Sequence, residues 1–486
     1  MMRLLRIAGS LSLALLLASC AGVMGPGVQV TTTDGQMAPI VSDTADASDD
    51  TLGARQAPAI IAQYGGIYSN RPAEIMLAQI VSRLLAAANQ GDARFTVTIL
   101  DTPDVNAFAL PGGYIFVTRG ILALANDESE LAAILAHEIS HVILHHSQAR
   151  TERARTTDLV DKVVTGVFGD DASTDQSANK AKLSFAAFSQ AQELAADKSG
   201  IEIAGHAGFD PYAAARFLGA MGRFAQYTQG DAAQGDDFLS SHPSTPDRIQ
   251  KATDIARTTF GPPGTGDTDR PDYMAAINGV TFGDSPDQGA IAGQRFIQPS
   301  LKFTFTVPPG YKLQMANGAV VGVASDGEAV RFDSADVPDT MALTDYLKSG
   351  WIAGLQPATV NGQSLNGNDT ASGVAATNQW NFRVQVVRFG GKVHRFIFAA
   401  RIDSELFARG ADETIKSFRA ANGGDLRQVH AVTIKTVTAG PVDSADSLAR
   451  KMGAVGDATN LFYVLNDLYP GDPVTPGQAY KVVAVN

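Results

Sequence analysis

The sequence His137-Glu138-Ile139-Ser140-His141 places two imidazoles and a carboxylate at a spacing that suits metal-assisted hydrolysis. A helix turns about 100° per residue, so histidines four residues apart lie within about 40° of each other and can face one zinc ion. Glu138 lies on the neighbouring face, where it can take a proton from an attacking water. The pattern predicts peptide hydrolysis at a zinc site, and chance spacing of three residues is the alternative.

Zinc needs one more protein ligand, because a catalytic site has three and leaves a fourth position open. The best candidate is Glu193, in an alanine-rich stretch that predicts a helix over about 178–203. Asp197 follows four residues later on the same face and can accept a hydrogen bond from a ligating histidine. From spacing alone, a solvated acidic helix face explains this pair equally well.

The segment that contains the HExxH motif has the pattern of a buried helix. Asp127 and Glu130 can form a capping box, and apolar residues then recur at helical spacing without Gly or Pro up to Ile143. His145 and His146 follow, and we expect them to interact with the carbonyl groups at the helix end rather than to bind metal.

Five further motifs occur around HExxH in a definite order. They are Tyr64-Gly-Gly-x-Tyr68, Asn106-Ala-Phe-Ala-Leu-Pro-Gly-Gly, Ser189-x-x-x-Glu193-x-x-Ala196-Asp197, Gly208-Phe-Asp-Pro211, and His242-Pro243 with Arg248. Together with HExxH they span roughly residues 59 to 257. This set resembles the HtpX-like zinc metallopeptidases of peptidase family M48, and especially the periplasmic BepA-type assembly proteases.

The resemblance implies a site with one Zn²⁺ per chain, bound by His137, His141 and Glu193. It also implies that His242 approaches the metal or the transition state, so His242 is either a gate that occupies the water position or a catalytic stabiliser. A loop histidine without a role is the alternative. Asp197 and Arg248 are expected to support the ligands from behind.

An edge strand holds the peptide substrate in the resembling family. Asn106, Ala107, Phe108 and Ala109 are therefore the expected main-chain contacts to substrate. The sequence departs from the family pattern at Gln190, where Arg usually follows the serine. This departure concerns substrate contacts and local charge, because Gln190 is not among the expected metal ligands.

The N-terminal 20 residues have the pattern of a lipoprotein signal peptide. Arg3 and Arg6 precede a short apolar run, which ends in Leu17-Ala-Ser-Cys20. This ending resembles the lipobox of bacterial lipoproteins, in which the cysteine is acylated. Cys20 is the only cysteine in the sequence, so it cannot form an intramolecular disulfide. We expect a lipid anchor on the periplasmic side of the outer membrane, with an ordinary signal peptide as the alternative.

Length and charge limit the other functions. A chain of 486 residues suggests two to four domains. Its net charge of −12 argues against binding nucleic acid, which prefers basic surfaces. After the signal, no apolar run is long enough to cross a membrane.

The predicted fold is α+β: a mainly helical, zincin-like metallopeptidase domain with a small edge-strand sheet, then a small α+β domain and a LysM-like βααβ module. The predicted boundaries are a signal peptide at 1–20, a flexible tether at 21–58, the peptidase domain at 59–260, a linker at 261–295, an α+β domain of unknown role at 296–422 and the module at 428–486.

The last segment resembles LysM modules, which bind glycans that contain N-acetylglucosamine, and this implies peptidoglycan as a partner. Asn466 and Pro476-Gly477-Gln478 match the pattern, whereas Gly440-Pro441-Val442 replaces the usual opening. A purely structural cap is the alternative.

These features predict a lipid-anchored zinc endopeptidase that acts on unfolded or misassembled envelope proteins in periplasmic quality control. The alternative is a zinc-containing chaperone, or a peptidoglycan-binding scaffold lipoprotein, in which proteolysis is latent.

Overall fold

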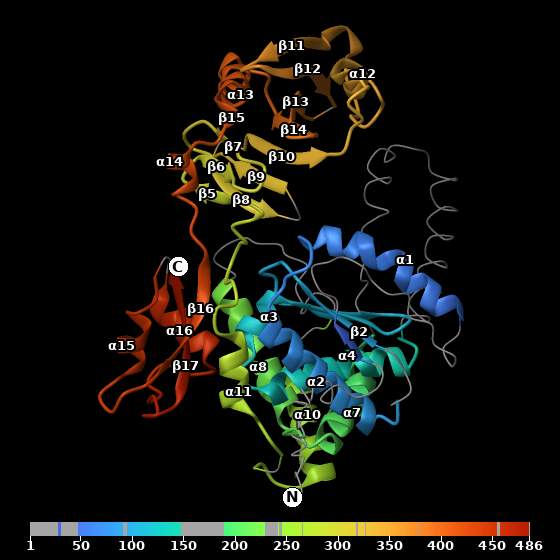
Figure 1. Cartoon of the computed structure of the whole chain (residues 1–486), viewed down its shortest axis with the longest axis vertical. Coiled ribbons are helices and arrows are strands. Elements are labelled where there is room, and N and C mark those ends of the chain that lie inside the picture. Colours follow the sequence, from blue (N-terminus) through green and yellow to red (C-terminus); the bar gives the residue numbers. More distant parts are fainter. Residues whose placement is uncertain are drawn as a thin grey trace, which may run out of the picture.

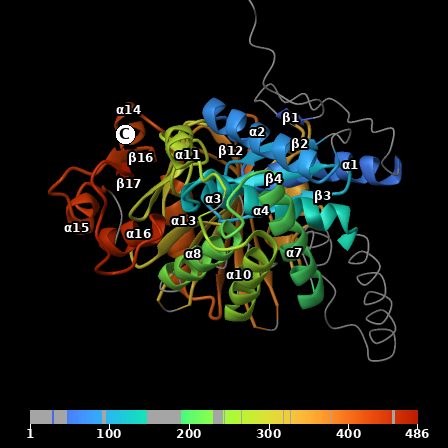
Figure 2. The ribbon, with the colours of Figure 1, turned by 90° about the horizontal axis from the view of Figure 1, so that it is seen from below.

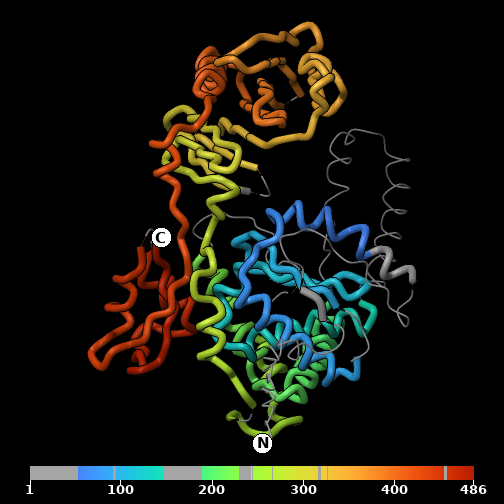
Figure 3. Tube along the Cα trace, viewed as in Figure 1, coloured from blue at the N-terminus to red at the C-terminus, as the bar shows by residue number. Residues whose placement is uncertain are grey.

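The computed structural model describes residues 28–30, 47–90, 95–146, 189–228, 242, 245–264, 266–316, 319–325, 327–377, 379–453 and 457–485. These residues form two bodies (Figure 1). One combines the elements up to α11 (Arg270–Ile277) with the C-terminal segment, and the other contains the elements from β5 (Ala290–Ala292) to β15 (Arg419–Ala420). Two connections between the bodies, around residues 280–290 and 425–432, run side by side (Figure 3).

Helices make up most of the first body. In chain order they are α1 (Ala47–Gln63), α2 (Arg71–Ala87), α3 (Arg119–Leu124), α4 (Glu128–Ile143), α7 (Gln190–His206), α8 (Ala213–Thr228), α10 (Pro246–Phe260) and α11 (Arg270–Ile277). Several begin at a residue whose side chain accepts a hydrogen bond from the first turn, as Asn70 does for α2 and Thr245 for α10. Among the described residues, no helix is both long enough and apolar enough to span a bilayer.

A small sheet lies among these helices, with strand order β1-β2-β4-β3. Its strands are β1 (Val28–Val30), β2 (Phe95–Leu100), β3 (Ala107–Leu110) and β4 (Tyr114–Thr118). β2 is parallel to β1 and β4, and β3 is antiparallel to β4. Gly112 and Gly113 form the predicted turn between β3 and β4 at φ 84° and 79°, a conformation that favours glycine. Among the described strands, β3 thus lies at the edge of this sheet.

The prediction of a flexible tether over 21–58 is wrong at both places where the structure describes this segment. Val28–Val30 pairs with β2, and α1 begins at Ala47. Ala57 and Ile60 lie one helical turn apart and are buried in a small core that also contains Phe108 and Phe116. This burial stabilises α1, although the surrounding composition is polar and Pro58 lies inside the helix.

The second body contains two sheets. One has the order β15-β7-β6-β5 and the other β11-β12-β13-β14-β10-β9-β8. Their strands are β5 (Ala290–Ala292), β6 (Arg295–Gln298), β7 (Phe303–Thr306), β8 (Lys312–Ala316), β9 (Ala319–Val323), β10 (Ala329–Ala335), β11 (Asn361–Leu365), β12 (Asn368–Ala376), β13 (Asn381–Phe389), β14 (Lys392–Ala400) and β15 (Arg419–Ala420).

Short helices accompany these sheets: α12 (Leu343–Leu347), η1 (Pro357–Thr359), α13 (Glu405–Ser417) and α14 (Gly423–Leu426). Helix α12 is short, because the chain turns after Lys348 and Gly350 adopts φ 95°. Phenylalanine rings fill the core between the sheets and α13, among them Phe296, Phe303 and Phe396. This agrees with the α+β character expected for the region.

The C-terminal segment has the predicted order of strand, helix, helix and strand. Its elements are β16 (Val432–Thr438), α15 (Ala445–Ala449), α16 (Ala458–Leu465) and β17 (Ala479–Val485), and β16 is antiparallel to β17. Its apolar residues belong to the same hydrophobic core as those of α2, α3, α4, α7, α8 and α11. Figure 2 shows α8 and α11 between this segment and α4 and α7. The segment is therefore an integral part of the first body.

The expectation of a linker over 261–295 is also wrong in its centre. Residues 270–277 form α11, whose Tyr273 and Met274 are buried against α2, α4 and the C-terminal strands. Beyond α11, the carbonyl of Val280 accepts a hydrogen bond from the N–H of Ile434, and the N–H of Phe282 donates one to the carbonyl of Val432. The composition of the region predicts a linker because Gly, Pro and Asp surround only one short apolar stretch.

Candidate metal centre

Helix α4 carries the HExxH motif and begins where the sequence predicts. Asp127 caps it by accepting a hydrogen bond from the backbone N–H of Glu130, although the Glu130 carboxylate bonds to the N–H of Asn126 instead of closing a capping box. His137 and His141 lie one turn apart and are both buried, with exposed fractions of 6% and 2%. Burial of two imidazoles on one helix face requires polar partners from another element.

Helix α7 supplies these partners. It begins at Gln190, where Ser189 and Gln192 form a capping box, and the predicted start near 178 lies outside the described residues. Gly200 allows α7 to approach α4 closely: a Cβ atom at this position would lie 2.9 Å from the backbone nitrogen of His137. This close approach brings Glu193 next to the two histidines.

Four side chains direct potential ligand atoms at one point: His137, His141, Glu193 and His242. The Nε2 atoms of His137 and His141 are 3.0 Å apart, and Nδ1 of His242 lies 3.2 Å from His137 Nε2. Glu193 Oε1 lies 3.4 Å from His141 Nε2 and 3.0 Å from His242 Nδ1. Among the described residues, this is the one group of three or more His, Cys, Asp or Glu side chains that could hold a metal ion.

These distances fit a tetrahedral metal ion. Ligand atoms about 2.0–2.1 Å from a zinc ion are separated from each other by about 3.3–3.4 Å in tetrahedral geometry. The four separations given above, 3.0–3.4 Å, lie at or slightly below this value, and all of the ligand atoms lie within 4.8 Å of one another. Imidazole nitrogens that converge so closely, with a carboxylate among them, form a donor set suited to a divalent cation.

Asp197 and Arg248 support the ligands from behind. Asp197 Oδ1 accepts a hydrogen bond from His137 Nδ1 at 3.0 Å, which leaves Nε2 directed at the other ligands. Arg248 donates to both carboxylate oxygens of Asp197 at 2.7 and 2.8 Å, and its Nη1 lies 2.8 Å from Glu193 Oε2. The arginine therefore joins the two carboxylates of α7 and fixes their spacing.

Burial and these contacts determine the charge of the ligands. Burial lowers the pKa of His141 to about 2 and that of His242 to about 4. Burial also disfavours ionised Glu193, but hydrogen bonds with His141 and His242 outweigh it and hold the Glu193 pKa far below its usual range. These shifts favour neutral His141 and His242 and ionised Glu193, the forms that bind metal. For His137, burial lowers the pKa, but the hydrogen bond to Asp197 and its charge outweigh burial and raise it.

His146 contacts a ligand, which the sequence did not indicate. Its Nδ1 lies 2.9 Å from Nδ1 of His141, so it meets the ring on the side opposite the ligand atom. His145 is exposed and adopts a left-handed conformation with φ 54°, just beyond the end of α4. A histidine five residues after a ligand carries no spacing signal of its own, and the turn at His145 is what directs His146 back towards α4.

Glu138 lies beside the four ligand atoms and faces Nε2 of His242, the ring nitrogen that does not point at Glu193. Glu138 is 2% exposed, and its Oε1 lies 3.6 Å from Nε2 of His242. His242 comes from a position 105 residues after His137, and its exposed fraction is also 2%. A buried carboxylate at the edge of a metal site is the arrangement that a general base requires.

The predicted substrate contacts lie on the edge strand. Ala107, Phe108 and Ala109 belong to β3 and Asn106 directly precedes it, and β3 packs against α4. An extended peptide can pair with the main-chain N–H and C=O groups of an edge strand. Cys20, the predicted lipid attachment point, lies outside the described residues.

Asn466, which matches the LysM pattern, has a structural place in this chain. Its side-chain amide donates to the carbonyls of Phe462 and Lys481, and its oxygen accepts from the N–H of Lys481. The residue therefore joins α16 to β17.

Comparison with known proteins agrees with this geometry. Residues 73–256 match the sequence profile of peptidase family M48. The chain is 31% identical over 199 residues to the mitochondrial metalloendopeptidase OMA1 of Schizosaccharomyces pombe, which covers 40% of this chain and 56% of that protein. It is 32% identical over 187 residues to the beta-barrel assembly-enhancing protease of Yersinia pestis, covering 36% and 37% of the two chains.

The corresponding protease of Escherichia coli strain K12 is 28% identical over 250 residues, which covers 46% of this chain and 50% of that protein. The chain thus spans between 37% and 56% of the length of these relatives.

Proposed function

Because the chain contains a peptidase M48 domain and is homologous to metalloendopeptidases, we propose that it is a zinc-dependent endopeptidase. The observation that carries the proposal is the convergence of His137, His141, Glu193 and His242, whose ligand atoms all lie within 4.8 Å of one another. Imidazole and carboxylate ligands in tetrahedral arrangement suit zinc better than calcium or magnesium, which prefer oxygen ligands in larger number.

The chain's own residues divide the work of hydrolysis. His137, His141 and Glu193 hold the metal, and Asp197 and Arg248 orient them. A bound zinc ion would polarise the scissile carbonyl and lower the pKa of the attacking water. Glu138 accepts the proton of that water and passes it to the leaving amine, a role that contributes about 10²–10⁴-fold to the rate in typical enzymes.

His242 is proposed to act as a gate in the resting enzyme. Its Nδ1 lies 3.0 and 3.1 Å from the two oxygens of Glu193 and 3.2 Å from His137 Nε2, which is as close as the other ligand atoms lie to one another. This place supports a fourth ligand that must leave before water can bind. His242→Ala should then raise basal proteolysis.

The alternative role for His242 is stabilisation of the transition state. Under that role, His242→Ala lowers turnover and leaves the zinc content normal. A variant with unchanged zinc content and unchanged turnover would reject both roles.

We propose unfolded or misassembled envelope proteins as substrates, in periplasmic quality control. The edge strand β3 supports an extended substrate, and two of the relatives are described as beta-barrel assembly-enhancing proteases. The proposal includes a lipid anchor at Cys20 that holds the chain on the periplasmic side of the outer membrane, and contact of the C-terminal segment with peptidoglycan. Sedimentation of the purified chain with peptidoglycan tests the last point, and failure to sediment would leave the segment a purely structural part of the first body.

The second candidate is a zinc-containing chaperone or scaffold with latent proteolysis. The position of His242 among the ligand atoms favours it, because a permanently bound fourth ligand would exclude water. A single experiment separates the two: hydrolysis of an unfolded protein such as reduced lactalbumin by the purified chain, before and after removal of metal with a chelator. The endopeptidase predicts cleavage that stops with chelator and returns with zinc, whereas the chaperone predicts zinc binding without cleavage.

A further inference from the structure

Lys481 of β17 reaches out of the C-terminal segment and into the helices of the peptidase domain. It has no exposed surface. Its Nζ donates hydrogen bonds to the carbonyls of Ala123, Leu124 and Ala125 at 2.8, 2.9 and 2.7 Å. Burial lowers the pKa of Lys481 well below its usual value, but three acceptors around Nζ match the three N–H groups of an ammonium. These carbonyls lie at the end of α3, where backbone acceptors lack partners within the helix and carry partial negative charge.

The carbonyls of the two neighbouring residues, Leu122 and Asn126, also accept hydrogen bonds. Tyr273 Oη of α11 donates to the carbonyl of Leu122 at 2.7 Å. Arg270 Nη1 donates to the carbonyl of Asn126 at 2.7 Å, and its Nη2 donates to the carbonyl of Ala479 in β17 at 3.2 Å. Five consecutive carbonyls, from 122 to 126, therefore accept hydrogen bonds from α11 and β17. The next residue, Asp127, caps the helix that carries HExxH.

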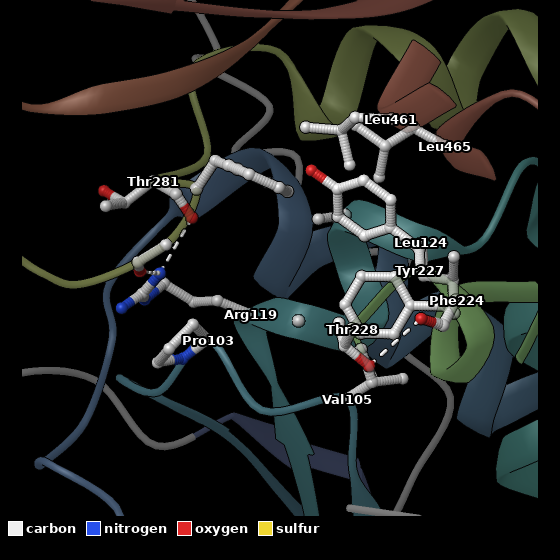
Figure 4. A pocket seen from close by; sticks show the side chains of 14 residues that line it. Pro103, Val105, Arg119, Leu124, Phe224, Tyr227, Thr228, Thr281, Leu461 and Leu465 are labelled. Carbon is white, nitrogen blue, oxygen red and sulfur yellow. Dashed lines mark hydrogen bonds between the residues drawn. The ribbon is translucent and has the colours of Figure 1, made fainter. Parts of the chain in front are cut away.

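Apolar side chains meet at the same junction. Leu124 of α3 and Leu461 and Leu465 of α16 are buried in one hydrophobic core. With Phe224 and Tyr227 of α8 they line a pocket of about 260 Å³ (Figure 4). Apolar contact is not directional, so the polar bonds of Lys481 are what fix the spacing between the C-terminal segment and the α3–α4 turn.

We propose that Lys481 is a positioning residue for the metal centre: it holds the α3–α4 turn and thereby sets the position of α4 along its axis. This inference rests on the proposed function. A helix moves largely as a rigid rod, so a shift of the turn is passed on to His137 and Glu138, about 14 Å further along at about 1.5 Å per residue. A displacement of about 1 Å of catalytic groups can lower a rate by about 100-fold.

The test replaces Lys481 by Met, which keeps the length of the side chain and removes its three donors. Lys451→Met is the matched control, because Lys451 lies in the same segment with a largely exposed side chain. In the full chain, Lys481→Met should lower kcat by about 10-fold or more while KM changes little. Amide hydrogen exchange of residues 122–131 should become faster, with the exchange of β16 and β17 unchanged. The control should change neither kcat nor exchange.

A lysine with a merely structural role would lower the melting temperature and leave kcat of the folded protein unchanged, and that result would overturn the inference. If Lys481→Met does not fold, Tyr273→Phe removes one bond to the same turn without touching β17. Tyr273→Phe should speed exchange at 122–124 and lower kcat by a smaller factor, and wild-type values for both would reject the proposal. If the wild-type chain binds no zinc and cleaves nothing, the proposed function fails, and faster exchange in Lys481→Met still decides whether Lys481 holds the turn.

Discussion

Asp197→Asn tests whether the contacts behind the ligands hold the metal centre together. Asp197 Oδ1 accepts hydrogen bonds from His137 Nδ1 and from Arg248 Nη2, and Oδ2 accepts one from Arg248 Nε. An asparagine keeps the shape but replaces one acceptor oxygen by an NH₂ group. Because both oxygens face N–H donors, either orientation of the amide places its NH₂ against at least one donor.

The expected fall in zinc affinity follows from loss of the hydrogen bond between Asp197 and His137. Removal of the partner of a ligating imidazole typically weakens metal binding by 10–100-fold, which corresponds to about 1.4–2.7 kcal/mol. Arg248 retains its contact with Glu193 Oε2 at 2.8 Å, so Glu193 stays in place in the variant. We therefore expect zinc affinity to fall by about 10–100-fold in Asp197→Asn, with the overall fold preserved.

Competition with a chromogenic zinc chelator at pH 7.5 measures this affinity, and circular dichroism verifies the fold. Asp247→Asn is the control, because Asp247 lies on the exposed side of α10 and pairs with Lys251 at 2.7 Å. Such exposed pairs contribute little to stability. A zinc affinity of Asp197→Asn within about threefold of both the wild type and the control would refute the role of Asp197.

Gly200→Ala should weaken zinc binding and lower the melting temperature, because its Cβ would lie 2.9 Å from the backbone nitrogen of His137. Metal analysis and calorimetry check this, and a variant with the zinc content and melting temperature of the wild type would contradict it. Burial, followed by the nearby Asp269, raises the pKa of Glu128 from 4.5 to about 7. The folded state therefore binds the proton more tightly than the unfolded chain, and stability is lost as pH rises between these values. Glu128→Gln should accordingly raise the melting temperature at pH 8 and have less effect at pH 5. Equal melting temperatures of the variant and the wild type at pH 8 would reject the argument. Cys20→Ser should abolish acylation and leave an unprocessed precursor, seen by mass spectrometry; retention in the outer membrane after a high-salt wash would instead indicate another anchor.

Local spacing was sufficient to place residues on a common helix face, although for Glu193 and Asp197 it left a solvated acidic face equally possible. His137 and His141 share a face because they are four residues apart, and Glu193 and Asp197 do so for the same reason. The structure brings the two faces together, and it does so through Gly200, whose role depends on a helix 60 residues away in sequence. Resemblance, rather than spacing, pointed to His242, because a loop residue has no periodic signal.

The parts that the sequence did not reveal depend on long-range contacts. Residues 47–58 are polar in composition, and residues 270–277 are a short apolar stretch among Gly, Pro and Asp. Both form helices because apolar residues in each are buried against distant elements. Lys481 is one lysine in an ordinary strand pattern, yet it bonds to carbonyls more than 350 residues earlier. Tertiary burial of this kind leaves no local sequence pattern. Boundaries predicted from composition therefore divided the first body into a tether, a peptidase domain, a linker and a C-terminal module.

The most direct test of the central claim compares Glu138→Gln with the wild type and with His137→Ala. Each purified protein is analysed for zinc content by mass spectrometry and for cleavage of an unfolded substrate. A base that is not a ligand predicts one zinc ion per chain in Glu138→Gln and a loss of hydrolysis of about 10²-fold or more, whereas His137→Ala should lose both. Turnover of Glu138→Gln at the wild-type rate, or full zinc content in His137→Ala, would contradict the account.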